Sequence, residues 1–332
     1  MNQFQLKFLK PLCLTLILSL GSQLTVLAQD DVSKNKTRNT LMGVWNITIE
    51  SDRGDRNGKL VFKTNESGFT GNLETETGTE SELKNIVLNN DEVAFELSVE
   101  RDGQQIQFEF DATLSGQLMN GNWRALLNQA EVATGTVTGT RQLELSDFRG
   151  YTTEEIGPGW SMKDGILHFD GNKCGDLVTK QEFGDFVLKF DWKISEAGNS
   201  GVMYRVSLGD KKPYLSGPEY QILDDDKHKD GKLESHRAGA LYALYVPNDK
   251  TLNAVGEWNS SKIVLKGNSV QHWLNGKKIV DAELGSEDWN KRVGASKFKN
   301  WGKFGKNKKG HVCFQDHGDP VWYRNIIIEP IN

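Results

Sequence analysis

The sequence lacks an excess of basic residues and has few cysteines. Its 332 residues contain 40 Lys and Arg against 45 Asp and Glu. A nucleic-acid-binding protein is normally basic, so this class is excluded. Of the three cysteines, Cys13 lies in the apolar N-terminal segment, which leaves Cys174 and Cys313 in the rest of the chain. The spacing of these two does not decide whether they form a disulfide bond.

A hydrophobic run long enough to cross a membrane is also missing. Lys7 and Lys10 precede the longest apolar run, Leu12 to Leu20, and small residues follow up to Ala28. The run is too short to span a bilayer, and this order of segments is typical of a secretory signal. A retained membrane anchor is the alternative, which the polar residues after the run disfavour. We therefore expect a signal peptide at 1–28, a tail at 29–40, no transmembrane segment after cleavage, and a periplasmic or secreted protein.

Helical periodicity is almost absent, and the sequence predicts an all-β protein of two domains. In residues 41–145, eight β-rich runs, one of them Glu82–Leu88, alternate with Gly, Asn and Asp turns. This pattern predicts an eight-stranded up-and-down antiparallel barrel. Gly43-Val44-Trp45 and Arg141 resemble a lipocalin-like barrel, in which such a Trp and Arg pack together at the closed end. Side chains can fill an interior of this size or leave room for one small ligand. We favour the filled interior, because no polar cluster stands out in it.

The strand pattern returns in residues 146–332 with longer strands and larger loops. About ten strands, including runs at Ala238–Leu244 and Ser269–Asp281, predict two packed antiparallel sheets in a jelly-roll sandwich. No repeat of 30 to 50 residues is found, so a propeller is not expected. Trp258, Trp273 and Trp322 lie within strand signals and are predicted to be core residues.

Three of these strands have one apolar face and a second face that carries polar or titratable side chains. The residues that oppose the apolar set are Met203 and Arg205, then Glu219 and Gln221, then Cys313, Gln315 and His317. Side chains two apart share one face of a strand. A solvated face is the alternative, and it would carry mainly Lys, Thr, Ser and Glu. The mixture of Arg, Glu, Gln and His with Met and Cys favours a shallow cleft.

Six ordered motifs in this domain carry a family resemblance. They are Asn199 to Arg205 (NSGVMYR), Gly217 to Asp224 (GPEYQILD), Gly239 to Tyr242 (GALY), Gly256 to Asn259 (GEWN), Trp273 to Gly276 (WLNG), and Gln315 to Gly318 (QDHG) followed by Arg324-Asn325-Ile326. Together they resemble the 3-keto-disaccharide hydrolase family over about residues 159–330.

The resemblance implies a concanavalin-like jelly roll that acts on glycosides whose C3 hydroxyl is already a ketone. The ketone acidifies the hydrogen on C2, so a base can remove it, the enolate can expel the C1 substituent, and water can add afterwards. This route needs a base, a group that holds the enolate oxygen, and an acid for the leaving oxygen. It does not need the paired carboxylates of ordinary glycosidases.

With this chemistry, the candidate catalytic residues are Glu219, His317 and Arg205. Glu219 is expected to be the base or a metal ligand, and His317 the partner acid or a second ligand. Arg205 is expected to hold the enolate oxygen or a sugar hydroxyl. The candidate substrate-binding residues are Gln221, Gln315, His236, Asp224, Tyr242 and Trp301.

Several of these residues have a structural alternative. His236 near a turn can be an ordinary surface residue, and Asp224 can be a turn-former beside Asp225 and Asp226. Trp301 and Phe304 can stack on a sugar ring or pack within their loop. The run DDDKHKD, residues 224–230, is interpreted as a solvated loop, because it lacks the glycine and terminal Glu of a calcium loop.

A cofactor is left open by the sequence. Glu219, His236 and His317 offer the oxygen and nitrogen ligands of a divalent metal ion, which would polarise the ketone, but no tight spacing motif supports the site. The expected partner is a carbohydrate. Two other function classes remain: a non-catalytic carbohydrate-binding protein that uses the same sheet face, and a structural or envelope protein defined by the barrel.

Overall fold

The computed structural model describes residues 41–66 and 68–331. The predicted signal peptide and tail lie outside the described residues. The chain forms two compact units, one made mainly of residues 47–115 and 119–138, the other of residues 43–46, 116–118 and the chain from Gly139 onward. Both units are built from strands, as the all-β prediction requires. No helix in the described part of the chain is long and apolar enough to cross a membrane.

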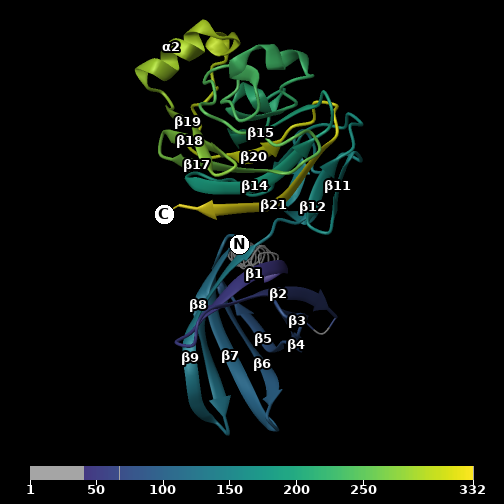
Figure 1. The fold of residues 1–332 in the computed structure, drawn as a ribbon, viewed down its shortest axis with the longest axis vertical. Helices are drawn as coiled ribbons and strands as arrows, with labels where there is room; N and C mark the ends of the chain where they lie inside the picture. The colour runs from purple at the N-terminus through teal and green to yellow at the C-terminus, as the bar shows by residue number, and fades with distance from the viewer. Residues whose placement is uncertain (1–40, 67, 332) are drawn as a thin grey trace, which may run out of the picture. The chain divides into compact units, whose positions relative to one another are not determined.

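The first unit is a barrel-like antiparallel sheet that is nearly closed (Figure 1). Its order is β4-β3-β2-β1-β9-β8-β7-β6-β5, so consecutive strands pair except β4 and β5, which are the two edge strands, and β1 lies beside β9. The strands are β1 (Gly43–Glu50), β2 (Arg56–Asn65), β3 (Gly68–Thr75), β4 (Glu80–Glu82), β5 (Lys84–Asn89), β6 (Glu92–Arg101), β7 (Gln104–Ser115), β8 (Leu118–Leu127) and β9 (Ala130–Arg141).

The ninth strand arises where the sequence predicts a single strand at Glu82–Leu88. The backbone turns at Asn85, which has φ 51°, and the β5–β6 register shifts between Lys84 and Val87. The break between the two strands is at Leu83, whose amide donates to the carbonyl of Gly71, so β4 pairs with β3 whereas β5, which contains the bulge, pairs with β6. The up-and-down order is confirmed, with nine strands in place of eight.

Aromatic side chains fill the interior of this sheet. Phe95 packs edge-on against Phe62, with ring centroids 5.6 Å apart, and stacks on Phe110 at 4.8 Å. Trp45 and Phe62 are almost completely buried. These contacts support the interpretation that side chains fill the barrel.

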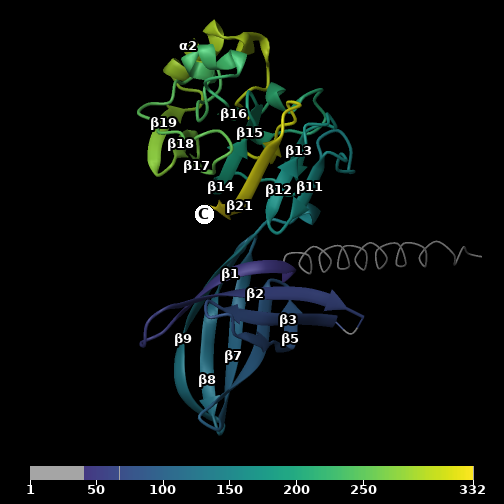
Figure 2. The same ribbon diagram turned by 45° about the vertical axis from the view of Figure 1, so that its right-hand side comes forward.

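The second unit is a sandwich of two antiparallel sheets, which confirms the predicted architecture (Figures 1 and 2). One sheet has the order β10 (Phe148–Gly150), β13 (Leu177–Thr179), β20 (His311–Phe314), β15 (Asn199–Val206), β16 (Glu219–Leu223). The other has the order β11 (Trp160–Lys163), β12 (Ile166–Phe169), β21 (Val321–Pro330), β14 (Phe186–Ile194), β17 (Asn259–Lys266), β18 (Ser269–Leu274), β19 (Lys277–Glu283).

Aromatic pairs join the two sheets of the sandwich. Tyr220 of β16 packs edge-on against Phe190 of β14, with ring centroids 5.6 Å apart. Phe314 of β20 meets Tyr323 of β21 at 4.8 Å. Alternate residues of a strand point to opposite faces. Since Tyr220 and Phe314 point into the core, their neighbours along β16 and β20 point to the outer face of the five-stranded sheet.

Short helices and long loops cover that outer face. Figures 1 and 2 both show α2 (Glu287–Ala295) and the loop after β16 on the side of the five-stranded sheet away from the seven-stranded one. The 3-10 helices of the second unit are η1 (Leu145–Asp147), η2 (Pro213–Leu215), η3 (Lys229–Lys232), η4 (Glu234–His236) and η5 (Lys297–Asn300).

Two predicted strands of the sandwich are wrong. Ser269–Asp281 is a hairpin, β18 and β19, because Asn275 (φ 46°) and Gly276 (φ 82°) form the left-handed turn that reverses the chain. Ala238–Leu244 is a turn segment with isolated bridges at Leu241, since its backbone amides bond to β16 and to its own turns.

The predicted core tryptophans Trp258, Trp273 and Trp322 are half-buried. Each has a cation over its ring: Lys193 lies 5.2 Å from Trp258 and 4.9 Å from Trp322, and Lys262 lies 3.9 Å from Trp273. These rings therefore pack with the stems and charges of outward-facing lysines, and the core prediction for them is wrong.

Cys174 and Cys313 are both free thiols, which answers the question that their spacing left open.

Candidate active site

Glu219 and Gly201 define the centre of the polar face. The two residues lie on adjacent strands, β16 and β15, and the carboxylate of Glu219 lies over Gly201. A Cβ atom at Gly201 would be only 2.0 Å from Oε1 of Glu219. The missing side chain at Gly201 therefore makes the space in which the carboxylate rests, and Glu219 keeps only 8% of its surface exposed.

Amides connect this position to His317. Nε2 of Gln221 donates to Oδ1 of Asn199 at 3.4 Å, and Nδ2 of Asn199 lies 3.4 Å from Nε2 of His317. The strands follow the order β20-β15-β16, so Glu219 of β16 and Asn199 of β15 share one face of one sheet, and His317 follows three residues after the end of β20. The expected adjacency of the strands is present, and Asn199, which the sequence analysis missed, links Gln221 with His317.

The loop after β16 covers this face with further titratable groups. Tyr242 donates a hydrogen bond from its hydroxyl to Oδ2 of Asp230 at 3.2 Å, and its ring packs on His236 with centroids 4.6 Å apart. Nδ1 of His236 lies 3.8 Å from the same carboxylate oxygen. The amide of Asp230 donates to Nδ1 of His228, which caps η3. Asp230 therefore connects Tyr242, His236 and His228, which all belong to this loop.

The electrostatic environment of Glu219 is unusual for a carboxyl group. Burial is the main cause that raises the pKa of Glu219 to about 8, and the negative charges of Asp176 and Asp230 raise it further. The positive charge of Lys297 acts in the opposite direction. Burial also raises the pKa of Asp176 to about 6. A carboxyl group in such a setting is a stronger base, once ionised, than an exposed one.

The two predicted histidines are shifted toward the neutral form. Burial lowers the pKa of His317 below its ordinary value, although Asp319 opposes the shift. Burial likewise lowers the pKa of His236, although Asp230 opposes it. Nδ1 of His236 is buried and makes no hydrogen bond within the described residues. The interpretation of His236 as a surface residue is therefore wrong.

Arg205 does not lie with these groups, and its predicted place in the site is wrong. It has φ 53°, and the β15–β20 register shifts between Met203 and Val206, so a bulge breaks the alternation that placed Arg205 beside Met203. Its guanidinium donates to the carbonyls of Gly184 (3.1 Å) and Gly267 (2.9 Å) and to Asp185 (2.9 Å). Arg205 holds loops of the seven-stranded sheet.

Asp224 is a buried turn-former, the structural alternative considered for it. Its carboxylate accepts hydrogen bonds from the amides of Ala197 (2.7 Å), Asp226 (3.1 Å) and Lys227 (3.2 Å). The interpretation of residues 224–230 as a solvated loop is wrong at both ends, because Asp224 is 2% exposed and Asp230 lies in the site.

The roles of Gln315 and Trp301 in substrate binding stay predictions. The backbone amide of Gln315 donates to the carbonyl of Gly201, and its side-chain Oε1 is buried without a hydrogen-bond partner among the described residues. Trp301 packs against Phe298 with centroids 4.9 Å apart and stacks on Tyr214 at 5.4 Å. Loop packing of Trp301 is therefore present, and a role in sugar stacking stays a prediction.

A group able to hold a metal ion lies at the His317 end of the face. His228, His317 and Asp319 each offer one ligand atom, and these atoms lie within 4.8 Å of one another. Glu219 and His236, which the sequence analysis placed with His317 as ligands, are not members of this group. Sequence reasoning missed His228 and Asp319, although the QDHGD run and the His in DDDKHKD are signals that could have indicated them.

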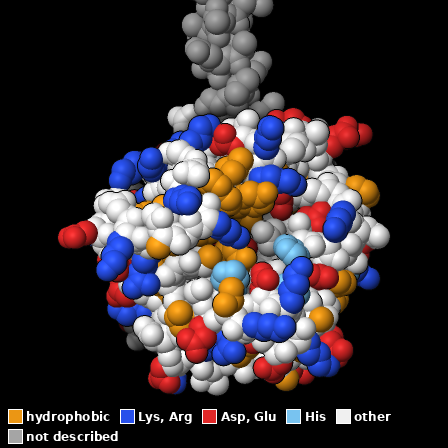
Figure 3. Space-filling model, turned by 90° about the horizontal axis from the view of Figure 1, so that it is seen from above, with side chains coloured by type: hydrophobic (Ala, Val, Ile, Leu, Met, Phe, Trp, Pro, Cys, Tyr) orange, Lys and Arg blue, Asp and Glu red, His pale blue; other side chains and the backbone are white. Residues whose placement is uncertain are grey.

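Figure 3 shows the second unit from the side that α2 and the loops cover. Two histidine side chains lie at the edges of a hollow, with acidic and basic groups beside them and an apolar patch along one side. Charged, titratable and apolar groups thus meet in one depression, as in sites that bind small polar ligands.

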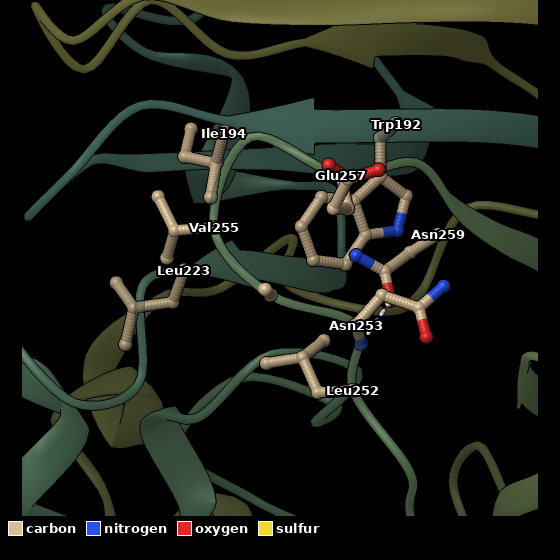
Figure 4. A pocket seen from close by; sticks show the side chains of 9 residues that line it. Trp192, Ile194, Leu223, Leu252, Asn253, Val255, Glu257 and Asn259 are labelled. Carbon is tan, nitrogen blue, oxygen red and sulfur yellow. Dashed lines mark hydrogen bonds between the residues drawn. The ribbon is translucent and has the colours of Figure 1, made fainter.

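A separate small pocket lies at the end of β14 (Figure 4). Trp192, Ile194 and Leu223 form its apolar wall, and the amide of Asn253 donates to Asn259 at 2.9 Å. Glu257 is its one titratable lining residue. Because its lining residues include no histidine, lysine or arginine, this pocket lacks the groups that acid–base chemistry needs.

Comparison with known proteins agrees with the family resemblance of the six motifs. Residues 122–329 match the model of the 3-keto-alpha-glucoside-1,2-lyase-like domain. A 3-keto-disaccharide hydrolase of Bacteroides thetaiotaomicron is 32% identical over 233 residues, which cover 60% of this chain and 80% of that protein.

Solved structures from Parabacteroides distasonis are also similar. One, provisionally named as a glycosyl hydrolase, is 36% identical, with a TM-score of 0.53, and the match covers 57% of this chain and 90% of that one. A second of the same description is 26% identical, with a TM-score of 0.46 over 55% of this chain and 99% of that one. Because the family model matches more than half of its residues, the chain belongs to the 3-keto-alpha-glucoside-1,2-lyase-like domain family.

Proposed function

We propose that the protein cleaves the bond between C1 and the leaving oxygen of 3-keto-glycosides, with Glu219 as the base that removes the C2 proton. The observation that carries the proposal is the buried carboxylate of Glu219 on a polar sheet face, in a chain that belongs to this family. The named hydrolase of Bacteroides thetaiotaomicron supports a disaccharide-like substrate.

The pKa of Glu219 suits this reaction. A hydrogen beside a ketone is a weak acid, so an ordinary exposed carboxylate has little driving force to remove it. With its pKa raised to about 8, Glu219 takes the proton more strongly while it is still partly ionised near neutral pH. No second carboxylate that activates water from the opposite face is required, in contrast to inverting glycosidases.

The remaining groups bind and orient the sugar ring. Gln221 and Asn199 present amides beside Glu219, and Gln315 presents a buried oxygen without a partner among the described residues. Nδ1 of His236 is likewise buried and has no hydrogen-bond partner in the described part of the chain. Sugar hydroxyls donate and accept hydrogen bonds, so they satisfy both kinds of atom.

The cofactor in this proposal is a divalent metal ion held by His228, His317 and Asp319. Two imidazoles and one carboxylate are ligands that divalent transition metals accept. The lowered pKa of His317 keeps its imidazole neutral, which is the form that binds a metal. It also favours the ligand role for His317 over the acid role. When bound, the ion supplies Lewis-acid polarisation of a substrate oxygen.

Export belongs to the proposal as well. The order of charged, apolar and small residues in 1–28 supports cleavage after Ala28 and a periplasmic or secreted location. Expression of the full chain, fractionation and N-terminal sequencing test this part. A protein that keeps Met1 and stays in the cytoplasm would contradict it.

The central test uses a 3-keto-glucoside with a chromogenic aglycone. We expect the wild-type protein to release the aglycone, and Glu219→Gln to bind the sugar without releasing it, because the amide cannot accept the C2 proton. Glu257→Gln, the same change at an exposed carboxyl group of the separate small pocket, serves as the matched control. Sugar binding with no turnover on any keto-glycoside would instead identify a non-catalytic carbohydrate-binding protein.

A further inference from the structure

Lys297 is a cation on a fixed backbone at the edge of the candidate site. It begins η5, directly after Ser296, whose hydroxyl accepts the amide of Phe298 at 3.1 Å and caps the turn. The next side chain, Phe298, is buried and stacks on Phe304 with centroids 4.2 Å apart. The cap and this anchor determine where the Lys297 side chain leaves the loop.

The contacts of Lys297 direct its ammonium group toward Tyr242. Nζ lies 3.3 Å from the Tyr242 hydroxyl and 4.3 Å from the centre of the Tyr242 ring. Within residues 41–66 and 68–331, Lys297 makes no ion pair with a carboxylate, whereas other lysines such as Lys250 and Lys303 do. An ammonium group has three donors, so donors remain for a ligand.

Tyr242 brings this cation to the side of Glu219. The amide of Tyr242 donates to the carbonyl of Glu219 at 3.0 Å, so the two residues are held together through the backbone. Lys297 is also the one positive group among the charges that act on Glu219; the others, Asp176 and Asp230, are negative. Among the described residues, Lys297 is thus the cation that acts on the base, whereas Arg205 is bonded to Gly184, Gly267 and Asp185.

We propose that Lys297 is a catalytic residue that donates a hydrogen bond to the C3 oxygen of the substrate and stabilises the enolate. The inference rests on the proposed function. Glu219 takes the C2 proton, and the C–H electron pair forms the C2=C3 bond while the C3 oxygen becomes negative. The C3 carbonyl then re-forms, a C1=C2 bond forms, and the C1–O bond breaks. The leaving oxygen takes up the proton that Glu219 removed, so atoms and charge balance.

The reason to place a cation there is geometric and electrostatic. The C3 oxygen is bonded to the carbon next to C2, so a group that holds it must lie close to the base. Charge develops on that oxygen only as the proton leaves, and a positioned donor therefore lowers the barrier more than it strengthens binding. Tyr242, bonded to both Lys297 and Asp230, positions the ammonium group.

The test compares Lys297→Met, Lys297→Arg and the control Lys299→Met on a 3-keto-glucoside. Methionine is a long unbranched side chain like lysine, and it removes the charge and the hydrogen-bond donors. Lys299 is an exposed lysine of the same short helix. We expect Lys297→Met to lower kcat about 100-fold with little change in KM, the loss typical of an oxyanion donor. Lys297→Arg should recover most of that loss, and Lys299→Met should behave as wild type.

Each outcome decides between the two proposals. Wild-type turnover with Lys297→Met close to wild type would overturn the role of Lys297 and leave the proposed function intact. An equal loss in Lys297→Met and Lys297→Arg, with lowered melting temperature in both, would show a structural role and overturn the catalytic one. A wild-type protein without turnover on keto-glycosides, but with normal sugar binding, would overturn the proposed function and this inference with it.

Discussion

Glu219 extends its carboxylate across the neighbouring strand into the space above Gly201, where a Cβ atom would lie 2.0 Å from Oε1. We expect Gly201→Ala to displace the carboxylate, because the end of a side chain yields more readily than the backbone. The change should reduce kcat/KM about 100-fold, comparable with other misplaced catalytic groups. Steady-state kinetics on a 3-keto-glucoside measure it.

Gly294→Ala is the control for this substitution, because no heavy atom lies within 4 Å of the Cβ position at Gly294 in α2. It should keep full activity and be slightly more stable. Full activity in Gly201→Ala would show that the carboxylate does not act from this position.

The pH dependence of turnover should report the raised pKa of Glu219. The ionised carboxylate is the active base, so kcat/KM should rise about tenfold per pH unit below the pKa near 8 and level off above it. A series of kcat/KM measurements from pH 6 to 9.5 tests this. A limb near the ordinary pKa of 4.5, with a plateau through pH 7, would contradict the environment described for Glu219.

The same carboxyl group should make the sandwich less stable at alkaline pH. The folded state holds the Glu219 proton up to about pH 8, whereas the unfolded chain releases it near the ordinary pKa of 4.5. Between these values the folded state binds more protons, so its stability falls as pH rises.

Glu219→Gln removes this loss of stability. We expect a higher melting temperature than wild type at pH 9 and no difference at pH 4, with a gain above about 1.4 kcal/mol, the equivalent of one pKa unit. Thermal unfolding at the two pH values measures it. An equal change at both would point to packing rather than ionisation.

Arg205 should matter for stability and not for chemistry. Arg205→Met removes the donors that hold Gly184, Gly267 and Asp185, and loss of one partner of a buried ion pair costs about 3 kcal/mol. Arg324→Met, at a partly exposed pair with Asp191, should cost less than about 1 kcal/mol.

Activity per folded molecule is the deciding measurement for Arg205. It should stay close to wild type in Arg205→Met at temperatures well below unfolding. A large fall in kcat with unchanged stability would restore Arg205 to the site.

Metal content separates the two proposed sets of ligands. After equilibration with a divalent transition metal and gel filtration, wild type should retain about one ion per chain. His317→Ala and His228→Ala should lose it. Glu219→Gln and His168→Ala should keep it, since His168 stacks on Trp322 of the seven-stranded sheet. Elemental analysis measures the content directly, and retention by His317→Ala would contradict the site.

Alternation was a sound guide wherever the strands are regular. Tyr220 and Ile222 enter the core, so Glu219 and Gln221 are turned to the opposite face, as the sequence predicts. The same rule failed at Arg205, because this residue has φ 53° and lies in a bulge, where the alternation of side chains between the two faces is interrupted. A bulge depends on pairing with β20, which the local sequence does not reveal.

The sequence by itself determined the all-β class, the sandwich and the family, and it put Glu219 forward as the candidate base. These follow from local periodicity and from motifs, which are properties of short segments. Only the tertiary structure determined the surroundings of Glu219. These are the space above Gly201, Asn199 between Gln221 and His317, and Lys297 beside Tyr242. Residues 78 positions apart, Glu219 and Lys297, come together because loop anchors such as Phe298 pack into a common core. Such packing is a property of the whole chain.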